Sequence, residues 1–328
     1  MKFFFGKAVS DDFIKEKLNW DKNNSVKKTA KFLAKKARIK VKKCYICCSS
    51  NSNKVCKFFG INYVQCIRCS LVYTNRILSQ KALNEYYKKS KNYFSEAYTN
   101  KNNINLRNNL IKPKIKFVEK YAKGKQWLDV GAAEGTTVDL ARKEGFQAEG
   151  IEISETSRKF AKKFRKIELL PYTLESFYSK NTKKWDVISF YGVIDVVSNP
   201  VEILHLARKM LSKKGIIVVQ VPNYESGSTL VQKLITNPAR HLKPPLNFKL
   251  FTLKSIKQLM KKTKFVPIVT WYSGMDMIEF IKYVRTLDTN FMDSGLDKFL
   301  IKNVNSFQQI FDDLSMSDMI VVIARKPN

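Results

Sequence analysis

The sequence predicts an α/β protein with a mostly parallel sheet, and two segments indicate this most directly. Residues 126–130 are expected to form a buried strand that ends in a turn at Gly131 and continues as a helix from Thr136. Residues 150–154 are expected to form a second buried strand, with Glu152 at its end. Gly131 and Glu152 are 21 positions apart, and about 20 positions usually separate a nucleotide-binding turn from the acid that binds a ribose. The two segments therefore predict a nucleoside site at the carboxyl ends of the strands.

The same alternation of helices and strands continues to the end of the chain. Periodic apolar residues predict helices over 105–123, 136–144 and 156–166. Short apolar runs predict further strands over 167–170, 187–190, 216–221, 265–271 and 319–324. Residues 275–317, between the last two strands, are expected to be a helical insertion.

The first turn lacks the full dinucleotide-binding pattern G-x-G-x-x-G, because Ala133 and Thr136 stand where its second and third glycines would be. The pattern present is Asp129-x-Gly131-x-Ala133-x-Gly135. It resembles motif I of the class I S-adenosylmethionine (SAM) methyltransferases. This resemblance implies an enzyme that transfers a methyl group from SAM.

Further segments within residues 111–328 resemble the same family in the same order. Residues 184–192 are similar to its fourth strand, and Asn199-Pro200 followed by 211–215 is similar to the run before its fifth strand. Residues 216–223 are similar to that fifth strand and its exit. The resemblance implies a Rossmann-like sheet of seven strands, mostly parallel, in which the last strand is antiparallel.

The position of Glu152 and the family resemblance together give the expected cofactor site. A carboxylate at this strand end can accept hydrogen bonds from both ribose hydroxyls, and small residues in the turn allow the ligand close to the backbone. The resemblance implies that Thr173 and Leu174 border the adenine and that Phe190 and Tyr191 lie near the methionine. The expected cofactor-binding residues are Asp129, Gly131, Ala132, Ala133, Gly135, Glu152, Ile153, Thr173, Leu174 and Phe190.

All six cysteines fall between positions 44 and 69, in a pattern typical of a metal site. Cys44-x2-Cys47 and Cys66-x2-Cys69 are separated by 18 residues, which lies within the spacing of zinc sites. Four thiolates complete a tetrahedral shell, so the site is predicted to be structural. Cys48 and Cys56 are left over, and Cys48 could replace Cys47 as a ligand.

The segment after these cysteines resembles another family feature. Many bacterial methyltransferases of sugar and secondary-metabolite pathways have a zinc knot that ends in C-x-x-C-G-L-x-Y/F, and here Ser70 takes the place of the glycine. A helical cap with tyrosines follows the knot in those proteins. The expected organisation is therefore a basic arm over 1–43, a zinc knot over 44–75, a cap or linker over 76–110 and a methyltransferase domain over 111–328.

The composition restricts where the protein works and what it binds. No apolar run reaches the roughly 18 residues of a membrane span, and the apolar start is too short for a signal peptide, so a cytoplasmic protein with reduced or metal-bound cysteines is expected. The formal net charge is +32, and residues 1–43 hold 14 Lys and Arg against 4 Asp and Glu. A solvated surface is the simplest interpretation. The positive charge also favours anionic partners. The candidates are a nucleotide-linked sugar, RNA, and a membrane surface contacted by the basic arm.

The sequence says less about the residues that bind and activate the methyl acceptor. Methyl transfer requires a positioned nucleophile and often a base. Related methyltransferases commonly carry histidines after the fourth strand and before the sixth, but here Asp195-Val196 and Asn247 stand at those places. The catalytic candidates are Asp195, Tyr191 and His241, and His205 is expected to be structural.

The sequence therefore predicts a SAM-dependent methyltransferase with a small-molecule acceptor. A sugar or a precursor of the cell envelope or of a secondary metabolite is expected, with O-methylation favoured. One alternative is an RNA methyltransferase that uses the basic arm and the zinc knot, although residues 190–193 lack the N-P-P-Y-like tetrad of base-modifying enzymes. A second alternative, motivated by the missing histidines, is a non-catalytic SAM-binding protein.

Overall fold

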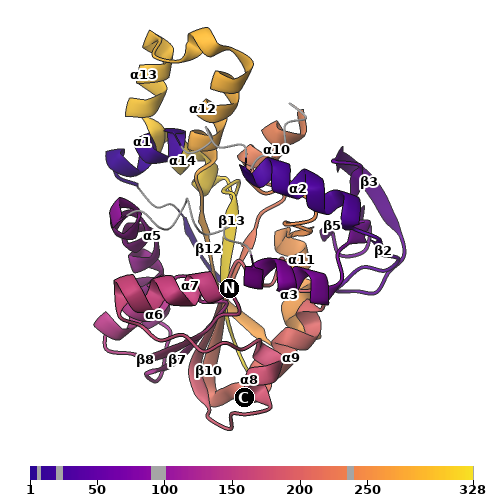
Figure 1. Cartoon of the computed structure of the whole chain (residues 1–328), viewed down its shortest axis with the longest axis vertical. Coiled ribbons are helices and arrows are strands. Elements are labelled where there is room, and N and C mark those ends of the chain that lie inside the picture. The colour runs from indigo at the N-terminus through magenta and orange to yellow at the C-terminus, as the bar shows by residue number, and fades with distance from the viewer. Residues whose placement is uncertain (6–8, 20–24, 90–100, 235–239, 328) are drawn as a thin grey trace. The chain divides into compact units, whose positions relative to one another are not determined.

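A computed structural model of the 328-residue chain describes residues 1–5, 9–19, 25–89, 101–234 and 240–327 (Figure 1). The chain forms two compact units, each assembled from separate segments. Unit 1 comprises residues 1–77, 221–256 and 270–321, and unit 2 comprises residues 78–220, 257–269 and 322–328. The linear boundaries at residues 43, 75 and 110 remain predictions.

The central sheet has the predicted mixed α/β character. Its strand order is β8-β7-β9-β10-β13-β12-β1. The strands are β7 (Gln126–Val130), β8 (Gln147–Ile151), β9 (Trp185–Tyr191), β10 (Leu211–Pro222), β12 (Val266–Ser273), β13 (Met319–Arg325) and β1 (Lys2–Phe5). β7 pairs in parallel with both β8 and β9, and β9 pairs in parallel with β10. The predicted mostly parallel, Rossmann-like sheet is confirmed.

One predicted strand is wrong. Residues 167–170 form only a single bridge, in which Leu170 pairs with Ile151. The preceding residue, Lys166, has a left-handed φ of 58°, and Pro171, which has no N–H to donate, follows directly. Only a short extended stretch fits between them. The seventh strand of the sheet is instead β1, at the edge next to β12.

Helices connect the strands of unit 2. They are α3 (Gln80–Lys89), α5 (Lys101–Glu119), α6 (Thr136–Lys143), α7 (Glu155–Phe160) with a π-helical continuation (Ala161–Arg165), α8 (Leu174–Tyr178), α9 (Pro200–Met210) and α11 (Leu253–Lys262), whose first turn belongs to unit 1. Of these, α5, α6 and α7 overlap the three helices predicted over 105–123, 136–144 and 156–166. Several begin with side-chain caps, since Ser154, Thr173 and Asn199 accept hydrogen bonds from the N–H groups of the first turns.

Unit 1 contains a smaller antiparallel sheet. β3 (Ser52–Phe58), β4 (Ile61–Cys66), β5 (Val72–Thr74) and β11 (Lys249–Leu250) pair in the order β11-β5-β4-β3. Its core joins residues that are distant in sequence, including Tyr63, Val72, Tyr224, Leu242 and Leu250. A two-residue pair, β2 (Ile39–Lys40) with β6 (Arg76–Ile77), closes this part of the unit.

The other helices of unit 1 are α1 (Asp11–Asn19), α2 (Ser25–Lys36), α10 (Gly227–Leu234), α12 (Asp276–Leu287), α13 (Gly295–Lys302) and α14 (Val304–Asp313), with a 3-10 turn at Thr289–Phe291. The last three and the turn lie within residues 275–317, for which the sequence predicted a helical insertion (Figure 1). Among the described residues, no helix combines the length and apolar character that crossing a membrane requires.

Candidate functional site

The candidate cofactor site lies where the sequence order of the strands reverses, between β7 and β9 of unit 2. β8 follows β7 on one side, and β9 and β10 continue on the other. Loops that leave the carboxyl ends of strands at such a point diverge and leave room for a ligand. The turn after β7 is tightly folded, because Gly131, Ala133 and Gly135 have left-handed φ values of 70°, 49° and 77°. The N–H groups of Gly131 and Ala132 both donate to the carbonyl of Ile151, at 2.9 and 3.0 Å.

Glu152 links this turn to the end of β8. One carboxylate oxygen accepts a hydrogen bond from the N–H of Ala133 at 2.9 Å, and the other accepts from the N–H of Ser154 at 2.7 Å. Only 6% of the residue is exposed, and burial raises its pKa although these two N–H groups and Arg158 oppose the shift. The carboxylate is thus held at the position that the sequence predicted for a ribose ligand.

Asp129, one of the predicted cofactor-binding residues, lies in β7 and bonds to Ser189 of β9. Its side chain is buried and accepts a hydrogen bond from the hydroxyl of Ser189, which in turn accepts one from the indole N–H of Trp127 at 2.8 Å. Burial raises the pKa of Asp129 to about 7, against the effect of its hydrogen bonds with Ser189 and Thr137. Asp129 therefore ties β7 to β9 directly beneath the turn.

The ion pair between Arg107 and Glu134 at the turn was not predicted from the sequence. Glu134 is buried and accepts hydrogen bonds from the Nε of Arg107 at 2.9 Å and from the hydroxyl of Thr136 at 2.6 Å. Burial alone would raise the pKa of Glu134, but Arg107 and Thr136 outweigh it and the pKa is lowered. The pair fastens α5 to the turn, 27 positions away, which no local pattern reveals.

A cavity of about 440 Å³ opens beside the turn and Glu152. Five of the predicted cofactor residues line it: Gly131, Glu152, Ile153, Thr173 and Leu174. Five others, Asp129, Ala132, Ala133, Gly135 and Phe190, are not among its lining residues and instead shape the turn and the sheet. The lining residues that the sequence did not indicate are Gln80, Asn84, Val130, Ile151, Tyr172, Glu175, Val193, Val197, Ser198, Asn199, Glu202 and Ile203.

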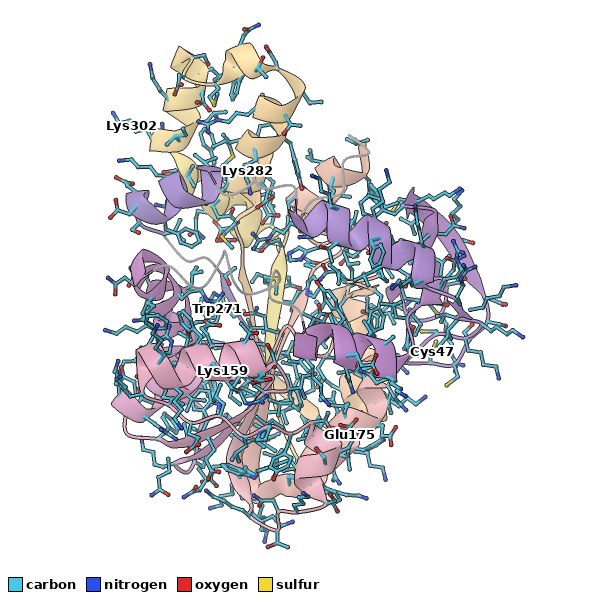
Figure 2. All side chains as sticks on the ribbon, viewed as in Figure 1. Cys47, Lys159, Glu175, Trp271, Lys282 and Lys302 are labelled. Carbon is cyan, nitrogen blue, oxygen red and sulfur yellow. The ribbon has the colours of Figure 1, made fainter. Side chains whose placement is uncertain are left out.

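Two of these additional residues come from α3. The side-chain amide of Gln80 donates to Asn84 at 2.8 Å, and its carbonyl accepts from the N–H of Ser198 at 2.9 Å. These bonds attach α3 to the segment that starts α9, so the cavity has polar groups on both sides. Glu175, which Figure 2 labels, lies on α8 at another part of its rim.

The segment after β9 carries two catalytic candidates. The hydroxyl of Tyr191 is buried without a hydrogen bond among the described residues, and burial raises its pKa well above 10. The ammonium of Lys114 lies 5.4 Å from the centre of the Tyr191 ring. Asp195 is buried in the turn that follows, where the N–H groups of Val196 and Val197 bond to the carbonyl of Val193. At neutral pH Tyr191 is therefore a hydrogen-bond donor and not an anionic base.

His241, the third candidate, belongs to unit 1 and to a buried charged network. Its Nε2 lies 3.1 Å from Nε of Arg240 and 3.5 Å from a carboxylate oxygen of Asp318. Arg240 also pairs with Asp318 and, at 3.5 Å, with Glu279. Burial lowers the pKa of His241 more than the neighbouring Asp318 raises it, so the imidazole is neutral at pH 7.

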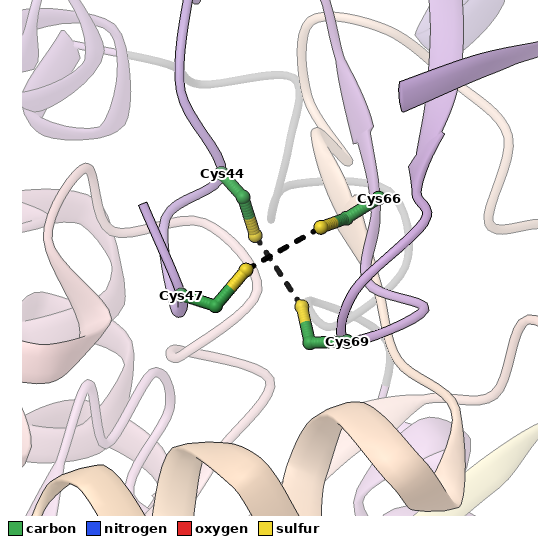
Figure 3. A group of neighbouring side chains, drawn as sticks. All are labelled: Cys44, Cys47, Cys66 and Cys69. Atoms are coloured by element: carbon green, nitrogen blue, oxygen red, sulfur yellow. Dashed lines mark hydrogen bonds between the residues drawn. The ribbon is translucent and has the colours of Figure 1, made fainter. Parts of the chain in front are cut away.

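The structure brings together the four cysteines that the sequence selected. The Sγ atoms of Cys44, Cys47, Cys66 and Cys69 all lie within 4.8 Å of one another, and the pairs Cys44–Cys69 and Cys47–Cys66 are 3.4 Å apart (Figure 3). A tetrahedral zinc ion with bonds of about 2.3 Å separates its sulfur ligands by about 3.8 Å. The four thiols therefore fit a zinc ion after only small adjustments.

The two cysteine pairs of this cluster, Cys44–Cys47 and Cys66–Cys69, have the same backbone conformation. In one, the N–H of Cys48 bonds to the carbonyl of Cys44, and in the other the N–H of Ser70 bonds to the carbonyl of Cys66. Cys48 and Ser70 both have left-handed φ values, 59° and 62°. This conformation explains the glycine of the family pattern at the position of Ser70. It also turns Cys48 outward, so Cys47 is the member of the cluster.

The cysteine cluster supports the segment that resembles the family's run before the sixth strand. β11 pairs with β5, which begins three residues after Cys69. The N–H of Thr74 donates to the carbonyl of Phe248 at 3.0 Å, and the hydroxyl of Tyr63 donates to the carbonyl of Asn247. The fully buried ammonium group of Lys249 lies 4.8 Å from the ring centre of Tyr45. Residues 247–250 are thus part of the small sheet.

The sheet order and the cavity at its switch point define a Rossmann-like protein with a nucleoside-sized site. A family model described as a methyltransferase domain matches residues 103–269, which is 167 of the 328 residues. The chain therefore belongs to this methyltransferase family. This confirms the prediction of an enzyme of the class I SAM-dependent methyltransferases.

Several solved structures are similar to the chain at low identity. A SAM-dependent methyltransferase from Archaeoglobus fulgidus is 18% identical, with 67% of this chain and 94% of that chain covered and a TM-score of 0.45. A magnesium protoporphyrin IX methyltransferase from Synechocystis PCC 6803 is 10% identical (76% and 100% covered, TM-score 0.48). A possible histamine N-methyltransferase from Thermotoga maritima is 14% identical (76% and 100% covered, TM-score 0.46). No curated protein sequence matches the chain.

Proposed function

We propose that the cavity beside Glu152 binds SAM and that the enzyme methylates a small-molecule acceptor. The observation that carries this proposal is the convergence of Gly131, Glu152, Thr173 and Leu174 on one cavity. The sequence assigned these residues to the methionine, ribose and adenine parts of one ligand. A volume of about 440 Å³ lies within the range of about 300–1,000 Å³ that small-molecule and cofactor sites occupy.

The acceptor is proposed to be a sugar or a precursor of the cell envelope or of a secondary metabolite, methylated on oxygen. SAM supplies an activated methyl group, so the protein's main task is to align the acceptor oxygen with it. Tyr191 is protonated at neutral pH, and its buried hydroxyl does not line the cavity, so its proposed role is to position the segment after β9. Asp195 is the proposed base, because it is the carboxylate nearest in sequence to the end of β9.

The test is incubation of the protein with methyl-labelled SAM and separated fractions of cell extract. Label in the sugar or small-metabolite fraction supports the proposal, and analysis of the product identifies the methylated atom. Label in RNA would instead favour the RNA methyltransferase, for which the basic arm was the motivation. SAM binding without label in any fraction would favour a non-catalytic SAM-binding protein.

We also propose a structural zinc ion at Cys44, Cys47, Cys66 and Cys69. The supporting observations are the short distances between the four sulfur atoms and the matching backbone turns around both cysteine pairs. Zinc would stabilise the small sheet and, through β11, the segment around Asn247. The ion supplies no reaction step, because four protein ligands leave no open position.

A further inference from the structure

The helices α13 and α14 bury a polar side and expose an apolar one. In α13 the only buried residue is Asp297, and in α14 the buried residues are Val304, Gln308 and Asp312. A helix on the surface of a soluble domain normally has the opposite arrangement, with its apolar side inward. The reversed pattern indicates that something covers the outward side.

Specific polar contacts fix which side faces the rest of unit 1. Asp297 forms a two-pronged ion pair with Arg285 of α12, at 3.0 and 2.7 Å. The side chain of Gln308 accepts a hydrogen bond from the N–H of Met277 at 3.0 Å and donates to Asp312 at 2.9 Å. These bonds lie on the inner side, so a rotation of either helix about its axis would break them. The apolar residues therefore remain on the outer side.

The exposed apolar residues form one stripe, here called the α13–α14 stripe. It consists of Met292, Leu296, Phe299, Ile310 and Leu314, of which 48% to 65% of the surface is exposed, together with the partly buried Phe307. The spacings of three, four or eight residues keep them on one helical side. The rings of Phe299 and Phe307 lie 6.0 Å apart, so the stripe continues across the junction between the two helices.

The two helices act as one kinked rod. Only Asn303 separates them, and helical hydrogen bonds run through it, from its N–H to the carbonyl of Phe299 and from the N–H of Phe307 to its carbonyl. Its φ and ψ of −106° and 16° depart from ideal helix values, which places the kink there. From Gly295 to Asp313 the rod is about 28 Å long, enough for more than two heptads of a helix pair.

We infer that the α13–α14 stripe is the contact of a symmetric homodimer, in which the rod of one chain packs antiparallel on the same rod of a second copy. The stripe is close to palindromic. An antiparallel pairing centred near Asn305 sets Leu296 opposite Leu314, Phe299 opposite Ile310 and Asn303 opposite Phe307. A two-fold interface requires such self-complementarity, since each residue must meet its partner twice.

The charges beside the stripe favour the same occupant. The stripe itself holds no charged residue, so the contact buries no charge. Residues 287–314 contain five aspartates and two lysines, a net charge of −3 in a chain of +32. A contact here therefore keeps the positively charged parts of the two copies apart. Aspartates at both ends of the stripe, Asp293 and Asp313, disfavour an anionic membrane.

The first test is the mass of the full chain in solution, measured by sedimentation or light scattering between about 1 and 100 µM, a range suited to an interface of ordinary size. The expected value is twice the 38.0 kDa of one chain. Leu296→Glu combined with Phe299→Glu should give a monomer with an unchanged circular-dichroism spectrum, because both side chains are exposed. Phe164→Glu is the control, since Phe164 is a similarly exposed phenylalanine in unit 2.

Cysteine cross-linking tests the antiparallel register. Leu296→Cys combined with Leu314→Cys should let oxidation cross-link the dimer, because these positions lie opposite each other in the antiparallel register and a disulfide needs Cα atoms within about 7 Å. Leu296→Cys alone should not cross-link, since the two copies of residue 296 then lie at opposite ends of the contact. A wild-type monomer at every concentration, or a dimer that the Leu296 and Phe299 changes leave intact, would overturn the inference. So would a cross-link that forms as readily with Leu296→Cys alone as with the cysteine pair, or a monomer that binds anionic phosphatidylserine vesicles through the stripe.

Discussion

Gly131 and Val193 lie so close together that a Cβ atom at position 131 would stand 2.6 Å from Cγ2 of Val193. Both residues line the cavity beside Glu152. The turn after β7 thus needs glycine at this position for two reasons, the left-handed φ of 70° and the contact with the segment after β9. The contact fixes the distance between the two loops that form the proposed SAM site.

This relationship predicts that Gly131→Ala lowers the free energy of unfolding by about 1–3 kcal/mol. Left-handed strain of about 1–2 kcal/mol and an overpacking cost of similar size are offset by about 0.5–1 kcal/mol of backbone entropy. It should also weaken SAM binding. Gly145→Ala is the matched control, because Gly145 has a φ of 79° but no heavy atom within 4 Å of an added Cβ. Adding Val193→Ala to Gly131→Ala should recover only the overpacking part. Equal losses for Gly131→Ala and Gly145→Ala in thermal unfolding would contradict the steric argument.

The position of Glu152 leads to a second prediction, about cofactor affinity. Glu152→Ala should weaken SAM binding by about 1–3 kcal/mol, because the ribose hydroxyls lose a charged hydrogen-bond acceptor. Titration calorimetry with SAM and with its demethylated product measures this change. Glu149→Ala is the control, since Glu149 lies on β8 three residues before Glu152 but pairs with Lys183 at 2.6 Å and does not line the cavity. A variant at position 152 that binds as tightly as the wild type would remove the main support for the proposed site.

The parts of the fold that depend on local sequence patterns could be predicted from the sequence. The turn at Gly131 and the acid at Glu152 are set by spacing along the chain, and the structure places both at one cavity. Two features of the site could not be predicted, because each depends on how helices distant in sequence pack. They are the ion pair between Arg107 and Glu134 and the contribution of Gln80 and Asn84 to the cavity lining. The wrong strand at 167–170 has a local cause, since an apolar run alone does not show that Lys166 and Pro171 stop the pairing.

The cysteine cluster gives a third prediction, on metal content. Elemental analysis of the purified protein should find one zinc ion per chain, and Cys44→Ser or Cys66→Ser should abolish it and destabilise the small sheet. Cys48→Ser should leave the metal content unchanged, because Cys48 is exposed and outside the cluster. A metal-free protein whose unfolding temperature is unaffected by chelators and by Cys44→Ser would contradict the zinc proposal.

Ser70 offers a smaller but sharper test of the same region. Its φ of 62° is left-handed, a conformation that costs a residue with a side chain about 1–2 kcal/mol. Glycine avoids this cost but loses more backbone entropy on folding, about 0.5–1 kcal/mol. Ser70→Gly is therefore expected to stabilise the protein by up to about 1 kcal/mol, and Ser70→Val to destabilise it. Chemical unfolding followed together with zinc release measures both, and a destabilising Ser70→Gly would show that the hydroxyl contributes more than the backbone strain.

Asp129 makes the stability of unit 2 depend on pH. Burial raises its pKa to about 7 in the folded protein, whereas an exposed aspartate titrates near 3.9. The folded state therefore holds a proton that the unfolded chain releases first, so this stabilisation is complete below about pH 4 and is lost as the pH rises through 7. The total change is at most about 4 kcal/mol. Asp129→Asn keeps the shape of the side chain but cannot ionise. Its free energy of unfolding should therefore increase relative to that of the wild type as the pH rises.

The measurement is the free energy of unfolding of wild type and Asp129→Asn at several values between pH 5 and pH 8. The difference between the two proteins isolates Asp129, because the other buried carboxyl with a pKa of about 7, Asp276 in unit 1, is present in both. The expected difference shifts in favour of the asparagine variant between pH 5 and about pH 7 and levels off above that. A constant difference would mean that Ser189 and Thr137, which hold the carboxylate by hydrogen bonds, keep Asp129 ionised over the whole range. In that case the strand ends beneath the proposed SAM site would carry a fixed negative charge, which would attract the positive sulfonium of SAM.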